Sequence, residues 1–396
     1  MVGARTQQAE MMTLAALAYT SATTRPSGES VADQEARILA GINGLLRSVA
    51  PTWQATWVGL TQDRANLAYI ARSATAGAPR LIVGLRGTVL SVFDIIQDVD
   101  VTTTVPYAVG ATTEGNLADG AMEAFTEVVL GTSLVAALSS FGDVGSLYVT
   151  GHSLGGAMVT TVAPYLAAEL AVAQVVPYTF AAPTAGDADF ASSFDQQFPS
   201  AQRVVNDYDV APNAWADLLN LQNPLGFFPD TATSVTLGII ALVEVVEALI
   251  GPLPGYRQPT AQPPLNSDFA VHHASGEISS YQDWFAEAEF QHHTSTYLTL
   301  LGASPLPLAE PVVQSVLPAC GPAAGGTSVT LTGTGFTSSS VVDFGVAPAT
   351  AVSVDASGTT LSVVSPPGAG VVDVTVTTEF GTSSTTPGDR FAFIPN

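Results

Sequence analysis

The most constraining feature of this sequence is the stretch SLYVTGHSLGGAMVTTVAPYLAAELA, residues 146–171. An apolar run predicts a buried strand, the glycine-rich hexapeptide predicts a sharp turn, and the apolar periodicity that follows predicts a helix. A serine in a G-x-S-x-G turn of this kind is typical of a nucleophile elbow, because small neighbours let strand and helix approach closely. Ser153 is therefore the candidate nucleophile. Pro164 inside the helix predicts a kink or an early end.

A serine hydroxyl is a weak nucleophile that needs a base, an orienting acid and donors for an oxyanion. Upstream, RLIVGLRGT reads as a second buried strand, and its end at Thr88 can present one backbone N–H near the elbow. The N–H of Leu154 supplies a second donor. Downstream, VVPYTF and AQRVVN predict two further strands, and Asp207 and Asp209 follow the second of them. Catalytic residues of open α/β sheets gather at the carboxyl ends of strands.

The base must come from five histidines. His152 adjoins the serine, which usually turns a side chain away from the reacting atoms, so we interpret it as a packing residue. The other four follow Asp209, so each preserves the chain order Ser, Asp, His that is expected when a nucleophile elbow stands on an α/β sheet. His292 opens a loop-to-helix passage and is the preferred base, with His293 as the alternative. His272 and His273 are predicted to be exposed loop residues.

The chain changes character near residue 305. Before this point apolar runs alternate with helical patterns, which is the α/β signature. After it, short stretches rich in Val, Thr, Ser and Gly alternate with a period of two, which predicts an antiparallel sandwich. We expect a first domain at 1–304, a linker at 305–310 and an all-β domain at 311–396.

The composition excludes several classes of protein. Hydrophobic residues make up 47% of the 396-residue chain and charged residues 11%, so the chain is not disordered. The formal net charge of −23 argues against nucleic-acid partners. The single cysteine, Cys320, cannot form an intramolecular disulfide or a thiolate metal site. No metal site and no cofactor motif are expected.

The apolar stretch at 234–255 raises the question of a membrane span. Glu244 and Glu247 stand three residues apart on one helical face, which is an amphipathic pattern. A single span here would also place Asp209 and His292 on opposite sides of a bilayer. We therefore expect no transmembrane segment and interpret residues 214–254 as a cap insertion, either an apolar acyl-binding wall or plain core packing.

With these pieces in order, residues from about 10 to 302 resemble a class 3 (fungal-type) lipase of the α/β-hydrolase fold. LIVGLRGT corresponds to that family's oxyanion strand, YVTGHSLGGA to its elbow and RVVNDYDVAP to its acid loop, which selects Asp209. HHTSTYL is similar to the family's ending and selects His292, five residues before Tyr297. The resemblance further implies that residues 89–100 form a lid. The residues of that lid expected to face the pocket or the interface are Val89, Val92, Phe93 and Ile96.

The chain departs from this family at two places. A His-x-Gly-Phe segment that the family often has reads LADGAMEAF here, and a usual histidine is replaced near Gln258. Both positions are structural in the family, so the candidate triad is unaffected.

The C-terminal region resembles the IPT/TIG family of immunoglobulin-like domains over nearly its whole length. The segments that carry this resemblance are SVLPACGPAAGGTSVTLTGTGF, VVDFG, SPPGAGVVDVTVTTEFGTS and RFAFIP. The region contains no His and no Lys. A spacer or binding appendage without chemistry of its own is the expected role.

Together these resemblances imply a serine carboxylester hydrolase, a lipase or esterase, that needs no cofactor and acts on lipid-like or other apolar esters. A feruloyl esterase or a polyester hydrolase is the alternative within the same class. The alternative from another class is a non-catalytic binding protein with a decayed hydrolase domain. We expect a secreted or cell-surface protein of a bacterium, and no signal peptide is evident in this sequence.

Overall fold

The computed structural model divides into two compact units, Met1–Ala18 with Val49–Pro305, and Tyr19–Ser48 with Leu306–Asn396. Helix α2 (Val31–Val49) falls almost wholly in the second unit, whereas the sequence analysis counted its residues in the first domain. The domain bounds given above stay predictions. The structure describes residues 2–19, 30–73, 80–86, 101–142, 144–170, 172–214, 228, 231–250, 255–261, 265, 278–304, 306, 311–336, 340–355, 359–378, 381–383 and 385–395.

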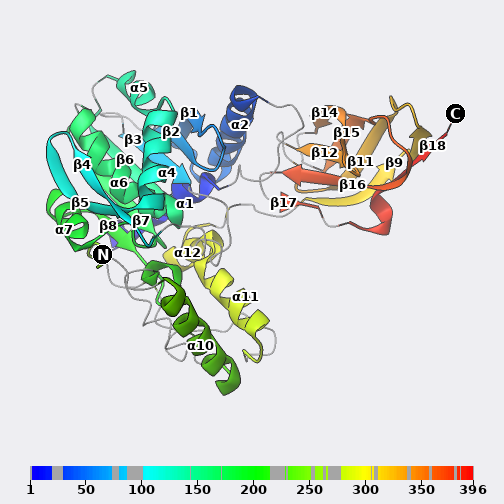
Figure 1. Cartoon of the computed structure of the whole chain (residues 1–396). Helices are drawn as coiled ribbons and strands as arrows, with labels where there is room; N and C mark the ends of the chain where they lie inside the picture. The colour runs from blue at the N-terminus through cyan, green and yellow to red at the C-terminus, as the bar shows by residue number, and fades with distance from the viewer. Residues whose placement is uncertain are drawn as a thin grey trace. The chain divides into compact units, whose positions relative to one another are not determined.

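The first unit is built on a six-stranded mixed sheet in the order β1-β2-β3-β6-β7-β8 (Figure 1). The first three strands pair antiparallel, and β3, β6, β7 and β8 are parallel to one another. The strands are β1 (Trp53–Leu60), β2 (Leu67–Ser73), β3 (Arg80–Arg86), β6 (Ser146–His152), β7 (Val175–Phe180) and β8 (Gln202–Val204). Because four parallel strands end at one edge, the segments that follow them meet there.

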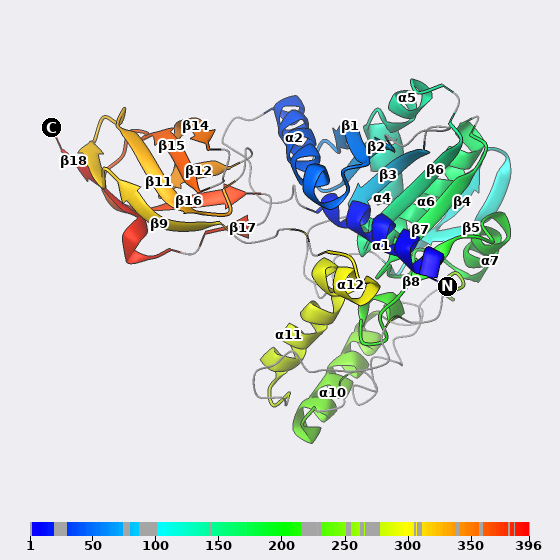
Figure 2. The same ribbon diagram turned by 180° about the vertical axis from the view of Figure 1, so that it is seen from behind.

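Both faces of the sheet are covered by helices. Helix α6 (Leu154–Glu169) packs against β3, β6 and β7 in one apolar core with side chains such as Val83 and Val149. Helix α1 (Val2–Leu17) lies on the opposite face (Figure 2), where Tyr69 Oη donates to Leu14 O at 2.5 Å. Buried on both faces, the central strands read as continuous apolar runs, as parallel strands do.

The remaining elements of the first unit surround this sheet. A two-stranded sheet pairs β4 with β5, and α7 packs on β5. Helix α10 falls inside the segment predicted as a cap and forms an apolar cluster with α11. The bounds are β4 (Thr104–Val109), β5 (Thr112–Ala118), α4 (Asp119–Gly131), α5 (Leu134–Ser139), α7 (Ala188–Gln197), a 3₁₀ turn (Ala211–Asn213), α10 (Thr233–Ile250), α11 (Tyr281–His292) and α12 (Thr294–Leu301).

Two expectations for the helices can be compared with the structure. Helix α6 continues through Pro164 to Glu169, so the expected early end is wrong. In the cap, Val235 and Ile239 of α10 are buried in the cluster with α11, so these two side chains serve core packing. Within the described residues, no helix has the length and apolarity that crossing a bilayer demands.

The strands of the second unit form an all-β sandwich. One sheet runs β14-β15-β11-β9 and the other β10-β18-β16-β12-β13, with β17 paired to β16. Val329 and Leu331 are buried between the sheets, as the period-two pattern predicts. The strands are β9 (Val312–Leu317), β10 (Cys320–Pro322), β11 (Ser328–Thr334), β12 (Val341–Phe344), β13 (Ala347–Pro348), β14 (Thr350–Val354), β15 (Thr360–Val364), β16 (Gly370–Thr378), β17 (Gly381–Thr382) and β18 (Arg390–Ile394).

Candidate active site

Ser153 occupies a strained turn between β6 and α6. Its backbone has φ 55° and ψ −131°, a combination with positive φ that non-glycine residues rarely adopt. The turn is held by a hydrogen bond from Ser153 N to Phe180 O of β7 at 2.9 Å. On the other side, Gly155 lets the start of α6 approach β3, because a Cβ at this position would collide with the carbonyl oxygen of Leu85. The elbow predicted from the sequence is thus wedged between two neighbouring strands.

The structure brings Ser153, His292 and Asp209 together at the carboxyl edge of the sheet. Ser153 Oγ lies 2.8 Å from His292 Nε2, and His292 Nδ1 lies 3.0 Å from each carboxylate oxygen of Asp209. All three side chains are buried. Because a carboxylate only accepts hydrogen bonds, His292 Nδ1 carries the hydrogen and Nε2 is free to accept one from the serine hydroxyl.

Asp209 is satisfied by further donors. Tyr297 Oη of α12 donates to Asp209 Oδ2 at 2.7 Å, and the N–H of Ala211 donates to Oδ1 at 3.0 Å. Burial raises the pKa of Tyr297 well above its ordinary value, and the neighbouring charge of Asp209 adds to this shift. Tyr297 therefore stays protonated and remains a donor to the carboxylate.

His292 is the last residue of α11, and that helix starts at a well-formed cap. Ser280 Oγ accepts from Asp283 N, and the Asp283 carboxylate accepts from Ser280 N. His293, the alternative base, caps α12 instead: its Nδ1 accepts from Ser295 N at 3.2 Å. His293 is exposed, and it contacts neither Ser153 nor Asp209 in the hydrogen bonds of this site.

Leu154, a predicted oxyanion donor, is the first residue of α6. The first N–H groups of a helix have no acceptor within it and point outward at its positive end, which suits an oxyanion. The other predicted donor, Thr88, lies outside the described residues, as do the predicted lid residues Val89, Val92, Phe93 and Ile96.

Two residues near the triad make contacts that the sequence analysis did not assign. His152 Nε2 lies 2.8 Å from the backbone oxygen of His292, and Asn206 Nδ2 donates to Gln291 O at 3.1 Å. The sequence predicts a packing role for His152, and Asn206 stands out there only as part of the RVVNDYDVAP motif. The scarcity of histidine was the one sequence signal that could have drawn attention to His152.

Gln258, at the position where a family histidine is replaced, makes structural contacts. Its Nε2 donates to Thr184 Oγ1 and Pro212 O, both at 2.9 Å, and so joins the segment after β7 to the turn after Asp209. Among the residues that the structure describes, no three His, Cys, Asp or Glu side chains gather closely enough to hold a metal ion.

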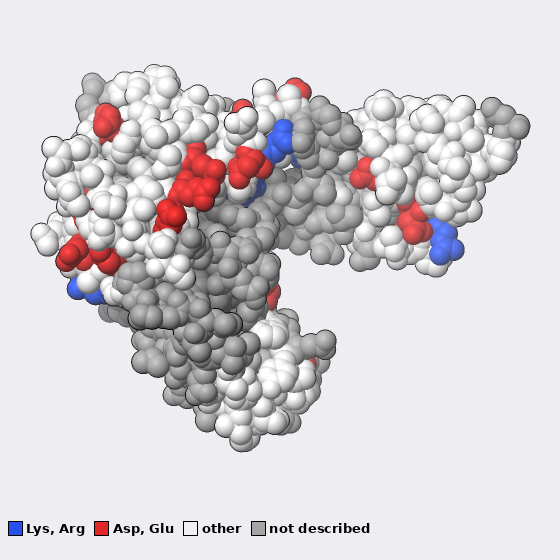
Figure 3. Space-filling view, in the orientation of Figure 1, with Lys and Arg blue, Asp and Glu red and all other residues white. Residues whose placement is uncertain are grey.

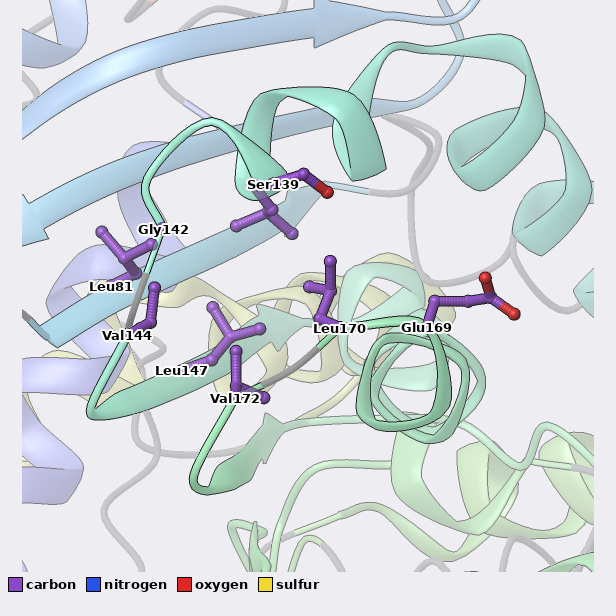
Figure 4. A pocket seen from close by; sticks show the side chains of 9 residues that line it. Leu81, Ser139, Gly142, Val144, Leu147, Glu169, Leu170 and Val172 are labelled. Atoms are coloured by element: carbon purple, nitrogen blue, oxygen red, sulfur yellow. The ribbon is translucent and has the colours of Figure 1, made fainter.

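The first unit also contains a cavity of about 310 Å³, which Figure 4 shows. None of the three triad residues lines it. Leu81 and Leu147, near the amino ends of β3 and β6, line it together with Leu170 and Val172. Because Ser153 follows the carboxyl end of β6, the cavity opens at the opposite edge of the sheet and takes no part in the candidate site.

A mixed sheet in which a parallel strand leads into a serine elbow and a helix, with an acid and a histidine later along the chain, is typical of the α/β-hydrolase class. Residues 82–218 match the class 3 lipase family, and residues 311–393 match the IPT/TIG domain family. The chain therefore carries a class 3 lipase domain followed by an IPT/TIG domain.

Individual relatives are consistent with this assignment. A lipase of Caenorhabditis elegans, ZK262.3, is 41% identical over 69 residues, which are 17% of this chain and 20% of that protein. The chain thus matches only a fifth of the length of that relative. The solved structure of M37 lipase aligns with a TM-score of 0.59 at 20% identity, covering 74% of this chain and 92% of that one. That likeness concerns the fold.

Proposed function

We propose that this protein is a serine carboxylester hydrolase that cleaves apolar esters through an acyl-enzyme intermediate. The observation that carries the proposal is the continuous hydrogen-bonded series from Ser153 Oγ through the His292 ring to the Asp209 carboxylate. The substrate class is supported by two similar proteins that are named lipases.

In the proposed reaction, Ser153 Oγ attacks the ester carbonyl while His292 Nε2 removes its proton. Asp209 holds the ring in the required tautomer and stabilises the imidazolium that forms. The N–H groups of Leu154 and Thr88 bind the oxyanion of the tetrahedral intermediate. His292 then protonates the leaving alcohol, and a water molecule activated by the same ring hydrolyses the acyl-enzyme.

A chain-length series of p-nitrophenyl esters tests the activity and the substrate class together. Ser153→Ala should lower kcat by about 10⁶-fold, because the nucleophile and its base act as one unit. The substitution is conservative, because it removes a single oxygen from a residue whose backbone is held by β7. Wild-type protein without activity on any ester would instead favour the binding-protein alternative.

The same assay extended to feruloyl esters and to a polyester film distinguishes the alternatives within the hydrolase class. We expect the highest kcat/KM on esters with long acyl chains. A preference for feruloyl or polymeric esters would overturn the apolar-lipid assignment and leave the serine hydrolase mechanism intact.

A further inference from the structure

The backbone on both sides of His292 is held by side chains from other parts of the chain. Helix α11 ends at His292, so its last carbonyl groups have no N–H donor within the helix. The carbonyl of Phe290 accepts from His293 N at 3.2 Å. The carbonyl of Gln291 accepts from Asn206 Nδ2 at 3.1 Å, and the carbonyl of His292 pairs with His152 Nε2 at 2.8 Å.

The two donor side chains belong to the segments that carry the other members of the candidate triad. His152 immediately precedes Ser153, and Asn206 stands three residues before Asp209. The segment with the candidate nucleophile therefore holds the carbonyl of His292 itself. The segment with the candidate acid holds the peptide group just before it.

We propose that His152 and Asn206 are positioning residues that clamp the backbone of His292, so that its ring stays within reach of both Ser153 and Asp209. This inference rests on the proposed function. Neither residue touches the reacting atoms in the proposed mechanism. Both act through the residue that does, by fixing the two peptide groups from which its side chain extends.

The surroundings of His152 suit this role. Because its partner is a carbonyl oxygen, His152 Nε2 carries the hydrogen and donates it. The His152 ring lies 4.8 Å from the His292 ring and 5.4 Å from the Tyr297 ring, centroid to centroid. Burial holds the pKa of His152 well below its ordinary value, and the neighbouring His292 lowers it further. A neutral ring at this place does not repel the imidazolium that forms on His292.

Asn206 is itself fixed by a buried polar network. Its Nδ2 also donates to Gln291 Oε1 at 2.8 Å, and Gln291 Nε2 donates to Glu287 Oε1 at 2.7 Å. Its backbone N–H donates to Tyr297 Oη at 3.0 Å, and that hydroxyl donates to Asp209. The clamp and the carboxylate are thus parts of one connected set of hydrogen bonds, in which each member limits the movement of the others.

A pair of substitutions at position 152 tests the clamp in the full-length protein. His152→Gln places an amide N–H near the position of Nε2, whereas His152→Asn is similarly polar but too short to reach the carbonyl. Thr179→Val is the control, because the buried Thr179 hydroxyl has no hydrogen-bond partner within the described part of the chain. The readouts are kcat and KM on a short p-nitrophenyl ester and the downfield proton resonance of His292 Nδ1–H.

We expect His152→Asn to lower kcat by about 10- to 100-fold with little change in KM, because a small displacement of a catalytic group has an effect of this size. The Nδ1–H resonance should shift or broaden. His152→Gln should retain most of the activity and the resonance, and Thr179→Val should behave as wild type. Asn206→Ala, the second variant, should reproduce the effect of His152→Asn.

Three results would overturn the clamp. His152→Asn and Asn206→Ala could keep the wild-type kcat and resonance. The two variants could also match the wild-type rate once rates are divided by the concentration of active sites titrated with a phosphonate. Finally, His152→Gln could be no more active than His152→Asn. If the wild-type protein cleaves no ester, the proposed function fails, and the resonance still decides whether His152 and Asn206 hold the ring.

Discussion

The core of the β-sandwich and the carboxyl edge of the first unit's sheet bury very different side chains. In the β-sandwich, the central cluster consists of Val, Leu and Phe residues contributed by both sheets, with Phe391 against Phe344 at 5.0 Å between ring centroids. At the carboxyl edge of the first unit's sheet, the buried side chains include Ser153, Asp209 and His292. One region removes apolar surface from water, and the other removes polar groups that water would otherwise solvate.

This difference separates what stabilises the protein from what it is proposed to do. Burial of apolar side chains favours folding directly. Burial of a carboxylate, an imidazole and a strained serine opposes folding unless each polar atom finds a partner. The hydrogen bonds that Asp209 accepts from Tyr297 and Ala211 offset part of that cost, and the arrangement fits the proposed catalytic role. Substitutions in the two regions should therefore affect different measurements.

Among the substitutions that test this comparison, the largest effect is expected from Asp209→Asn. The amide keeps the shape of the carboxylate but favours the wrong tautomer of His292, so kcat on p-nitrophenyl esters should fall by about 10⁴-fold. Urea unfolding followed by tryptophan fluorescence should change little by comparison. A variant that keeps full activity would show that Asp209 does not orient the base.

A large effect on stability, rather than on activity, is expected from Phe391→Ala in the sandwich. Loss of this fully buried ring should lower the unfolding free energy of that domain by about 3–5 kcal/mol. The four tryptophans lie at 53, 57, 215 and 284, so their fluorescence does not report on residues 306–396. Calorimetry should therefore show an earlier transition that fluorescence does not follow, while kcat stays unchanged. A matching fall in esterase activity would show that the two regions are coupled.

Alkaline pH should sharpen the comparison. Burial raises the pKa values of Tyr69, Tyr107 and Tyr297 above the usual value. Above about pH 10 the unfolded chain loses protons that the folded chain keeps, so the unfolding free energy falls as pH rises, by about 1.4 kcal/mol per pH unit for each group. Residues 306–396 contain no tyrosine, so the sandwich should not show this slope.

Tyr69→Phe is the matched variant, because the Tyr69 hydroxyl bonds to Leu14 O of α1, on the face of the sheet opposite α6. When unfolding is followed by tryptophan fluorescence, the unfolding free energy of this variant should fall less steeply with pH. The expected difference in slope is about 1.4 kcal/mol per pH unit, which corresponds to one proton. An unchanged slope would mean that Tyr69 ionises equally in the folded and unfolded chain.

The smallest effect concerns the acidic surface. Acidic side chains gather over α4 (Figure 3), where Asp119, Glu123 and Glu127 stand four residues apart. Partial burial raises the pKa of Glu127, and the charges of Asp63 and Glu123 raise it further. Glu127→Gln should stabilise the protein at low salt by about 0.2–0.5 kcal/mol, and about 1 M NaCl should abolish the difference by screening. A gain that survives high salt would contradict an electrostatic cause.

Much of the fold could be predicted from the sequence because its signals are local. The elbow around Ser153 is a strand, a turn and a helix in direct succession, and each part has its own pattern. The same holds for the alternating Val329 and Leu331 of the sandwich. Pro164 shows where a local rule fails: the helix continues past it because tertiary packing on the sheet outweighs a single lost hydrogen bond.

The rest of the candidate site could not be predicted, for a physical reason. The bonds from His152 and Asn206 end on backbone oxygens, which every residue possesses, so no pairing of side-chain types reveals them. Tyr297 was noted for its spacing from His292, but its hydrogen bond to Asp209 depends on how α11 and α12 pack. The choice between His292 and His293 depends on a single backbone turn, which spacing alone does not determine.

The position of His292 at the end of α11 has a consequence for the redesign of this protein. The same helix shares an apolar cluster with α10, in which Trp284 and Ala288 of α11 pack with Val235 and Ile239 of α10. An exchange of α10 would therefore displace α11 and, with it, the candidate base His292. Libraries built on this scaffold should accordingly vary α10 and α11 as one block.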